Sequence, residues 1–281
     1  MITINPNCTH CYRCVKACPS NIFLISDDKS VQTTNEQRCI RCGHCVAACG
    51  ANAVVHESFP PEKVHAIDYS KLPTPEQTLL LIRKRRSNRT FSSKAIPEEY
   101  LSQILEAAHR APTARNLQNV EFTLVSDPQQ INLITEFTLD TFMSSAKFVD
   151  NAVFRPLVKR FLPDIHKYLP MVKKMKQVYD EQGKDIGILK GATAVLLIHA
   201  PKSAPWGCVD CNLAYQNASL MAESLGVGQF YTGFVLRASK QRKQKLEKML
   251  GINGKIHAGM ALGMPLFEYA NYIDRKDRGG G

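Results

Sequence analysis

Eight cysteines within the first 49 residues constrain this chain more than any other feature of its sequence. They form two runs with the spacing C-x2-C-x2-C-x3-C, and each cysteine of the second run lies 31 residues after its counterpart. The runs are Cys8, Cys11, Cys14 and Cys18, followed by Cys39, Cys42, Cys45 and Cys49. The repeat extends past the cysteines, since Asn21 and Asn52 also correspond. This pattern predicts two copies of one supersecondary unit.

The spacing favours two [4Fe–4S] clusters, because three thiolates on a tight loop can bind three irons of one cubane. The fourth cysteine of each run then points at the other cluster. We therefore expect Cys49 to complete the site of Cys8, Cys11 and Cys14, and Cys18 to complete the site of Cys39, Cys42 and Cys45. Zinc is the alternative, but zinc ribbons use two pairs of ligands and not two runs of four.

Residues 1–57 resemble a bacterial-type two-cluster ferredoxin, and the two cysteine runs, the first followed by Pro19, carry that resemblance. Gly50 departs from the family pattern, which usually has a second proline at this position. Because proline helps to shape the ligand loop, the stability or potential of one cluster is expected to differ.

Composition limits what the rest of the chain can be. With 281 residues, 44% hydrophobic and 22% charged, the chain can form one large domain or two smaller ones. Its apolar stretches are far shorter than the roughly 20 residues of a membrane span. No charged and apolar leader precedes Cys8, so we expect a cytoplasmic protein without a membrane segment.

The formal net charge of +11 suggests an anionic partner, which can be a nucleic acid, an acidic protein or a small molecule. No nucleic-acid-binding motif accompanies the charge, so we expect no nucleic-acid partner.

The remaining sequence predicts a proline-rich linker at 58–73 and then alternating helices and strands, an α+β layout with a sheet between helices. Helices are expected from Pro75, from Pro97 and over 212–225 and 239–250. Strands are expected over 120–125, 192–198, 229–236 and 255–262.

Several short motifs in this part occur in a characteristic order. They are Arg85-Arg86-Ser87-Asn88-Arg89, Thr113-Ala114-Arg115-Asn116-Leu117-Gln118, Tyr231-Thr232-Gly233, Gly263-Met264-Pro265 and Arg275-Lys276. Together they resemble the nitroreductase family of FMN-dependent oxidoreductases, over residues 74–281.

The resemblance implies an FMN site. Arg85, Arg86, Ser87 and Arg89 match the segment that contacts the phosphate and the flavin edge, and Arg275 and Lys276 match a basic pair near the same phosphate. Arginine suits that role because its planar fork binds phosphate through paired hydrogen bonds. Thr113, Asn116 and Gln118 match the loop around the ribityl chain and the pyrimidine end. Tyr231, Thr232 and Gly233 match the segment beside flavin N5.

The resemblance also implies a homodimer and a variable helical insert at 138–190 that covers the substrate. For this insert, a solvated amphipathic helix pair is the simpler interpretation of its lysines and aromatic residues. Cys208 and Cys211 form a further C-x2-C pair, for which buried structural cysteines are favoured over a redox dithiol or half of a metal site.

The two halves together predict an oxidoreductase. Electrons from a low-potential donor such as a ferredoxin or hydrogenase would pass through the clusters to FMN and then to a nitroaromatic, quinone or other electron-poor small molecule. Two alternatives stay open, in which NAD(P)H reduces FMN and the clusters export electrons, or the chain is an electron-transfer subunit of a larger complex. No side chain is nominated as the proton donor.

Overall fold

The computed structural model describes residues 1–150 and 165–276, except for the side chains of residues 147–150 and 165–168. By internal contacts the chain divides into two compact units. The first comprises residues 1–73 with 114–117, and the second comprises residues 74–113 with 118–281.

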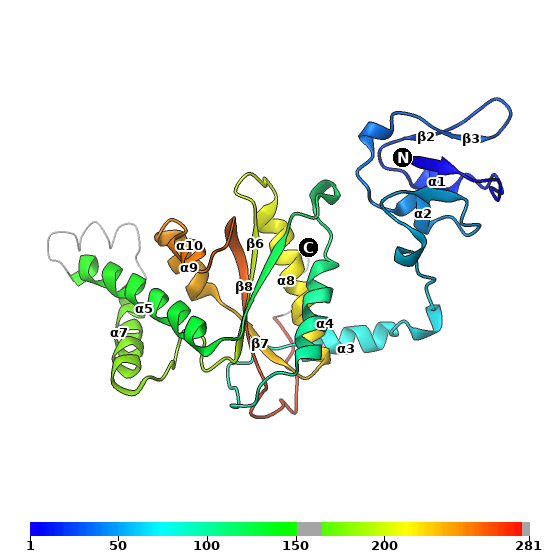
Figure 1. The fold of residues 1–281 in the computed structure, drawn as a ribbon. Coiled ribbons are helices and arrows are strands. Elements are labelled where there is room, and N and C mark those ends of the chain that lie inside the picture. Colours follow the sequence, from blue (N-terminus) through cyan, green and yellow to red (C-terminus); the bar gives the residue numbers. More distant parts are fainter. Residues whose placement is uncertain (151–164, 277–281) are drawn as a thin grey trace. The chain divides into compact units, whose positions relative to one another are not determined.

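The first unit is built from two short antiparallel strand pairs and two short helices (Figure 1). β1 (Ile2–Ile4) pairs with β4 (Val54–His56), and β2 (Phe23–Ile25) pairs with β3 (Val31–Thr33). The helices are α1 (Arg13–Ala17) and α2 (His44–Ala47), and a 3-10 turn covers Glu36–Arg38. Ile22, Phe23 and Val54 form the small core together with the buried cysteines Cys14 and Cys45.

The 31-residue sequence repeat is also a repeat of the backbone. α1 and α2 begin at Arg13 and His44, 31 residues apart, and β2 and β4 keep the same offset. Left-handed φ values recur at the same offset: His10 with Arg41, Tyr12 with Gly43, and Asn21 with Asn52. These conformations are uncommon outside glycine, so their recurrence confirms that the two copies share one loop geometry.

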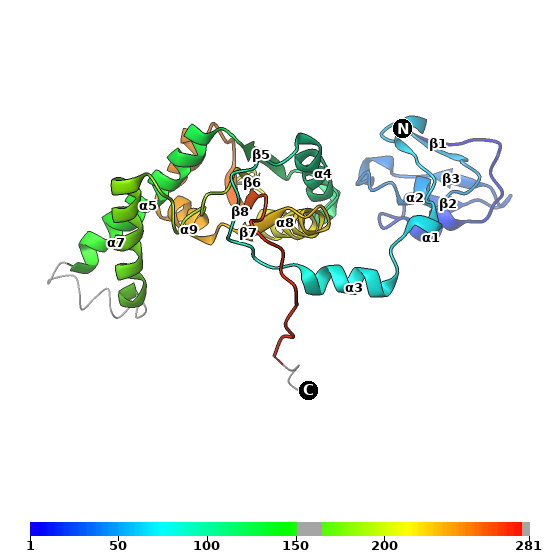
Figure 2. The same cartoon turned by 90° about the horizontal axis from the view of Figure 1, so that it is seen from below.

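The second unit contains one four-stranded antiparallel sheet in the order β5-β6-β8-β7. Its strands are β5 (Glu121–Val125), β6 (Ala194–Ala200), β8 (Lys255–Gly263) and β7 (Gly228–Tyr231). Helices cover both of its faces (Figure 2), with α4 (Glu98–His109) and α8 (Gly207–Ser224) on one and α5 (Pro128–Asp150) and α9 (Gly233–Gln241) on the other. The remaining helices are α3 (Pro75–Lys84), α7 (Ile165–Gln182) and α10 (Lys245–Met249). This arrangement confirms the α+β class.

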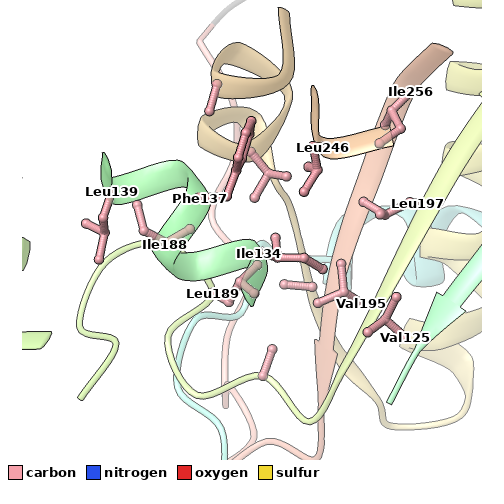
Figure 3. Packing of buried hydrophobic residues seen from close by; sticks show 14 of the residues in the cluster. Val125, Ile134, Phe137, Leu139, Ile188, Leu189, Val195, Leu197, Leu246 and Ile256 are labelled. Carbon is pink, nitrogen blue, oxygen red and sulfur yellow. The ribbon is translucent and has the colours of Figure 1, made fainter. Parts of the chain in front are cut away.

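Strand β6 shows why both faces need cover, since all seven of its residues are buried. Val195 and Leu197 belong to the core on the α5 and α9 side, whereas Leu196 and Ile198 belong to the core on the α4 and α8 side. Figure 3 shows Ile134 of α5 pointing toward the first pair. The period of two in a strand therefore divides one apolar run between two cores.

Two expected elements differ from the structure. The strand expected over 229–236 ends at Tyr231, and α9 begins at Gly233 because Val235 and Ala238 pack into the core as helical residues. The single helix expected over 239–250 is interrupted at Lys243 and Gln244, which have left-handed φ values, and α10 follows.

Helix α3 agrees closely with the sequence. Thr74 accepts from the Gln77 N–H at 3.2 Å, and the Gln77 side chain accepts from the Thr74 N–H at 2.9 Å, which is a complete capping box. Along the described residues, no helix has the combined length and hydrophobicity needed to cross a membrane.

Candidate functional site

The first unit contains two separate hollows lined by the cysteines, and both cysteine runs contribute to each hollow. One hollow is lined by Cys8, Cys11, Cys14 and Cys49. The other is lined by Cys18, Cys39, Cys42 and Cys45. In both, three cysteines come from one run and the fourth comes from the other run, after the short helix. All eight are free thiols.

The surroundings of these sulfurs are suited to thiolates. The Ala53 N–H donates to Cys49 Sγ at 3.1 Å, and the Arg41 N–H donates to Cys39 Sγ at 3.4 Å. The Arg13 N–H lowers the pKa of the exposed Cys11 thiol, with a smaller contribution from the Thr9 hydroxyl.

Burial has the opposite effect at the inner positions. It raises the pKa of Cys14 and raises that of Cys45 to about 11. A positively charged metal centre would compensate for this cost, since it stabilises the deprotonated ligand.

The quartets are not arranged for one metal ion. Throughout the described ranges, no group of three or more His, Cys, Asp or Glu side chains is close enough to hold a single ion. Four cysteines around one hollow fit a larger group, because a cubane places its irons, and so its ligands, further apart than the four ligands of a zinc ion.

In the second unit, the segment that contains Arg85, Arg86, Ser87 and Arg89 has no regular secondary structure and is held by hydrogen bonds to its backbone carbonyls. The Gln229 side chain donates to the Arg86 carbonyl at 3.4 Å. Beyond the arginines, the Leu266 N–H donates to the Thr90 carbonyl at 3.1 Å. Among the described residues, none of the three arginines forms an ion pair with a carboxylate, so their charge is available to an anion.

Phe91 anchors this segment to the sheet. Its ring lies over Gly228 and Gly263, which are paired across β7 and β8. A Cβ on Gly263 would lie 2.7 Å from Phe91 Cγ, so the ring can sit there only because both strands lack a side chain. Phe91 stacks on Phe230 at 6.0 Å between centroids, and the Arg89 guanidinium lies 5.5 Å from the same Phe230 ring.

Two tyrosines link the arginines to the Tyr231-Thr232-Gly233 segment. The rings of Tyr215 and Tyr231 meet edge to face at 4.8 Å. Burial raises the pKa of Tyr215 to about 12, and the nearby Arg85 and Arg89 oppose that shift. The structure therefore brings Arg85, Arg89 and Tyr231 into one neighbourhood.

Within the Tyr231-Thr232-Gly233 segment, the three residues differ in what they offer a ligand. Tyr231 is partly exposed, and its hydroxyl donates to Asn212 Oδ1 at 3.0 Å. Thr232 is 1% exposed, and its Oγ1 has no hydrogen-bond partner within the described part of the chain. Gly233 is exposed, and a Cβ added there would have no atom of the described residues within 4 Å. The open surface is therefore at Tyr231 and Gly233.

The remaining residues expected at the FMN are placed as follows. Gln118 N–H donates to Thr113 Oγ1 at 2.9 Å, which closes the loop between them. Asn116 lies in the turn at 114–117, which groups with the first unit. Arg275 and Lys276 are exposed, and within the described part of the chain no hydrogen bond links them to the Arg85–Arg89 segment.

The expected insert at 138–190 corresponds to the end of α5, α7 and the residues that follow. Residues 151–164 of that insert lie outside the described residues. Cys208 and Cys211 lie near the start of α8, and the expectation that both are buried is confirmed for Cys211 but wrong for Cys208, which is exposed. Burial raises the pKa of Cys211 to about 12, as expected for a core thiol.

Sequence reasoning missed the residues that hold the arginine segment in place. Tyr215 donates to Gln229 Oε1 at 2.8 Å, and the Gln229 amide donates both to Ser219 at 2.8 Å and to the Arg86 carbonyl. No sequence signal marks Gln229, because its importance comes from its position on β7. Phe91 could have been identified from the sequence, because it lies next to the arginine motif. The pairing of the two glycines beneath its ring could not, because it depends on the sheet.

Comparisons with known proteins agree with this architecture of a cysteine-rich unit followed by an antiparallel sheet between helices. Residues 82–264 match the nitroreductase family, and residues 1–50 match the 4Fe-4S dicluster domain. The chain belongs to the nitroreductase family and carries an N-terminal 4Fe-4S dicluster domain.

Curated relatives are distant. An Archaeoglobus fulgidus protein, named provisionally as an NADH dehydrogenase/NAD(P)H nitroreductase, is 27% identical over 206 residues, which cover 72% of this chain and 93% of that protein. An FMN reductase [NAD(P)H] of Bacillus subtilis is 26% identical over 182 residues, which cover 64% of this chain and 62% of that protein.

Among solved structures, a Bacteroides fragilis nitroreductase with bound FMN has a TM-score of 0.53 and 20% identity, and the match covers 72% of this chain and 96% of that one. A Desulfitobacterium hafniense nitroreductase with bound FMN has a TM-score of 0.53 and 21% identity over 72% and 95%. These similarities establish the fold of the second unit.

Proposed function

We propose that this chain is an iron–sulfur flavoprotein oxidoreductase that carries two [4Fe–4S] clusters and one FMN. The observation that carries the proposal is the joint presence of two four-cysteine hollows and a nitroreductase-family unit in one chain. When bound, clusters pass single electrons and a flavin accepts them one at a time and delivers a pair, so the two groups have complementary chemistry.

For the clusters, we assign Cys8, Cys11, Cys14 and Cys49 to one and Cys18, Cys39, Cys42 and Cys45 to the other. The lining of the two hollows supports this crossed assignment.

For FMN, we assign the phosphate to Arg85, Arg86, Ser87 and Arg89, since these arginines form no ion pair with a carboxylate of the described residues and are held near the edge of the sheet. Tyr231 and Gly233 offer the open surface on which the ring system would rest. Thr113, Gln118, Asn116, Arg275 and Lys276 are assigned only by resemblance to the family.

The protein's own residues hold the FMN anion and fix its orientation. Because the backbone that carries these arginines is already held, it loses little freedom when they bind phosphate, which increases affinity. Their positive charge also stabilises negative charge that develops on a bound flavin when it is reduced.

We propose that electrons enter through the clusters from a low-potential donor and leave to an electron-poor small molecule such as a nitroaromatic or a quinone. The alternative is direct reduction by NAD(P)H with export through the clusters, which the names of the Archaeoglobus and Bacillus relatives favour.

We also propose a homodimer, on the basis of the resemblance to the family and of exposed apolar side chains. Leu79, Leu80 and Ile82 of α3 are 45%, 55% and 49% exposed, and Leu266 and Ile273 near the C-terminus are also exposed. A second copy is the proposed cover for these side chains. If the wild-type chain sediments as a dimer and Leu80→Glu as a monomer, this assignment is supported. Equal masses for the wild-type chain and the variant would oppose it.

The test of the function is anaerobic purification with iron, sulfide and flavin analysis on one sample. We expect about eight irons and about one FMN per chain. Full iron without flavin would refute the proposal for the second unit. Rapid mixing with NADH or NADPH under argon then separates the two directions, since fast flavin bleaching supports the alternative and no bleaching supports entry through the clusters.

A further inference from the structure

A buried histidine lies beside one of the two cysteine quartets. His56, the last residue of β4, is 4% exposed, and its Nε2 lies 3.6 Å from Cys39 Sγ. It lines the same hollow as Cys18, Cys39, Cys42 and Cys45. The ring is held by Phe59, whose centroid lies 4.9 Å away.

A backbone donor fixes which ring nitrogen carries the hydrogen. The Ser58 N–H donates to His56 Nδ1 at 3.0 Å, and a backbone amide has no acceptor capacity at nitrogen. Nδ1 must therefore be the bare nitrogen, and Nε2 carries the hydrogen. The contact with Cys39 is then an Nε2–H···Sγ hydrogen bond donated to the sulfur.

The other half of the repeat has no such donor at the matching position. His56 corresponds to Ile25, 31 residues earlier, and Ile25 is 48% exposed. The two copies therefore share a loop geometry but differ at this side chain.

A donor of this kind acts on cluster potential. Reduction adds negative charge to a cluster whose ligands are already thiolates, and an N–H directed at a ligand sulfur stabilises that added charge. The effect is larger at a buried site, where water screens less.

We propose that His56 is a positioning residue that acts through Cys39 and raises the reduction potential of the cluster bound by Cys18, Cys39, Cys42 and Cys45. This rests on the proposed cluster ligation. His56 thus makes the two clusters energetically distinct although their ligand spacing is identical.

The test is an anaerobic redox titration of the whole chain followed by EPR, with iron and sulfide measured on every sample. His56→Leu and His56→Phe remove the donor, and His56→Gln keeps an amide N–H at a similar reach. His65→Leu, a change at an exposed histidine of the linker, is the matched control.

We expect both apolar variants to lower the potential of one cluster only. A tenfold change in its reduction equilibrium corresponds to about 59 mV for a one-electron couple. His56→Gln should retain most of the wild-type potential, and His65→Leu should retain all of it.

An apolar variant with full iron and two unshifted potentials would overturn the proposal. If both apolar variants lose iron, the result for His56→Gln is decisive. Wild-type potentials in His56→Gln support the donor role, whereas an equal shift of both cluster potentials in this variant refutes it. Failure of the proposed cluster ligation is recognised separately, because the wild-type chain would then contain clearly fewer than about eight irons.

Discussion

The contact between Phe91 and the paired glycines gives the sharpest test of how the arginine segment is held. In Gly263→Ala, the new Cβ would lie 2.7 Å, 2.8 Å and 3.0 Å from Cγ, Cδ1 and Cβ of Phe91. These distances are shorter than contacts between carbon atoms, so the ring must move. Overpacking of this kind costs about 1–3 kcal/mol, of which the reduced freedom of the unfolded chain offsets roughly 0.4–1 kcal/mol. We expect Gly263→Ala to lower the free energy of unfolding by about 1–2 kcal/mol.

The single tryptophan makes this measurable in the second unit alone. Trp206 lies directly before α8, so its fluorescence during urea unfolding of the cofactor-free chain reports only on that unit. A lower midpoint with an unchanged slope would indicate lost stability and not an altered unfolded state.

A double-mutant cycle tests the cause. Phe91→Ala removes Cγ and Cδ1, the two atoms closest to the new methyl group, so the cost of Gly263→Ala should shrink by about 1 kcal/mol or more in that background. Costs that add within about 0.5 kcal/mol would refute the reasoning. Because Phe91 and Arg89 both contact Phe230, Gly263→Ala should also retain less FMN on gel filtration.

Three further predictions concern other parts of the chain. Cys18→Ala should lose the cluster of the second run and leave about four irons, whereas about eight irons would contradict the crossed ligation. Arg85→Ala should weaken FMN binding about tenfold or more, as expected for a lost charge-assisted hydrogen bond, while Arg83→Ala should not; equal flavin titrations would contradict the phosphate assignment. Burial lowers the pKa of His199 despite the nearby Glu121 carboxylate, so the folded chain resists its protonation. The free energy of unfolding should therefore fall as pH drops below about 6.5, because the unfolded chain binds the additional proton, and His199→Gln should flatten this dependence.

Features with a strict period or a local cap could be predicted from the sequence. The cysteine repeat predicted two copies of one structural unit. Its 31-residue offset recurs in the backbone conformation, even at non-glycine positions such as His10 and Arg41. The start of α3 at Pro75 was also predictable, since its capping involves only Thr74 and Gln77, three positions apart.

The start of α9 could not be predicted in this way. The apolar run from Gln229 to Leu236 fits a strand locally, but the chain turns at Thr232 and the following residues pack as a helix. That choice comes from tertiary contacts of Val235 and Ala238, and intrinsic propensity is easily overridden by such contacts.

The arginine segment illustrates the same division at the candidate site. Its residue types are evident in the sequence, and they suggest an anion. What makes them a defined site is the backbone pairing that places Gly228 opposite Gly263, because only that pair admits the Phe91 ring. An irregular loop that carries arginines would lose much backbone freedom on binding phosphate. Phe91 and Gln229 bear part of that cost during folding, so substitutions beneath the loop should change FMN affinity even though they touch no cofactor atom.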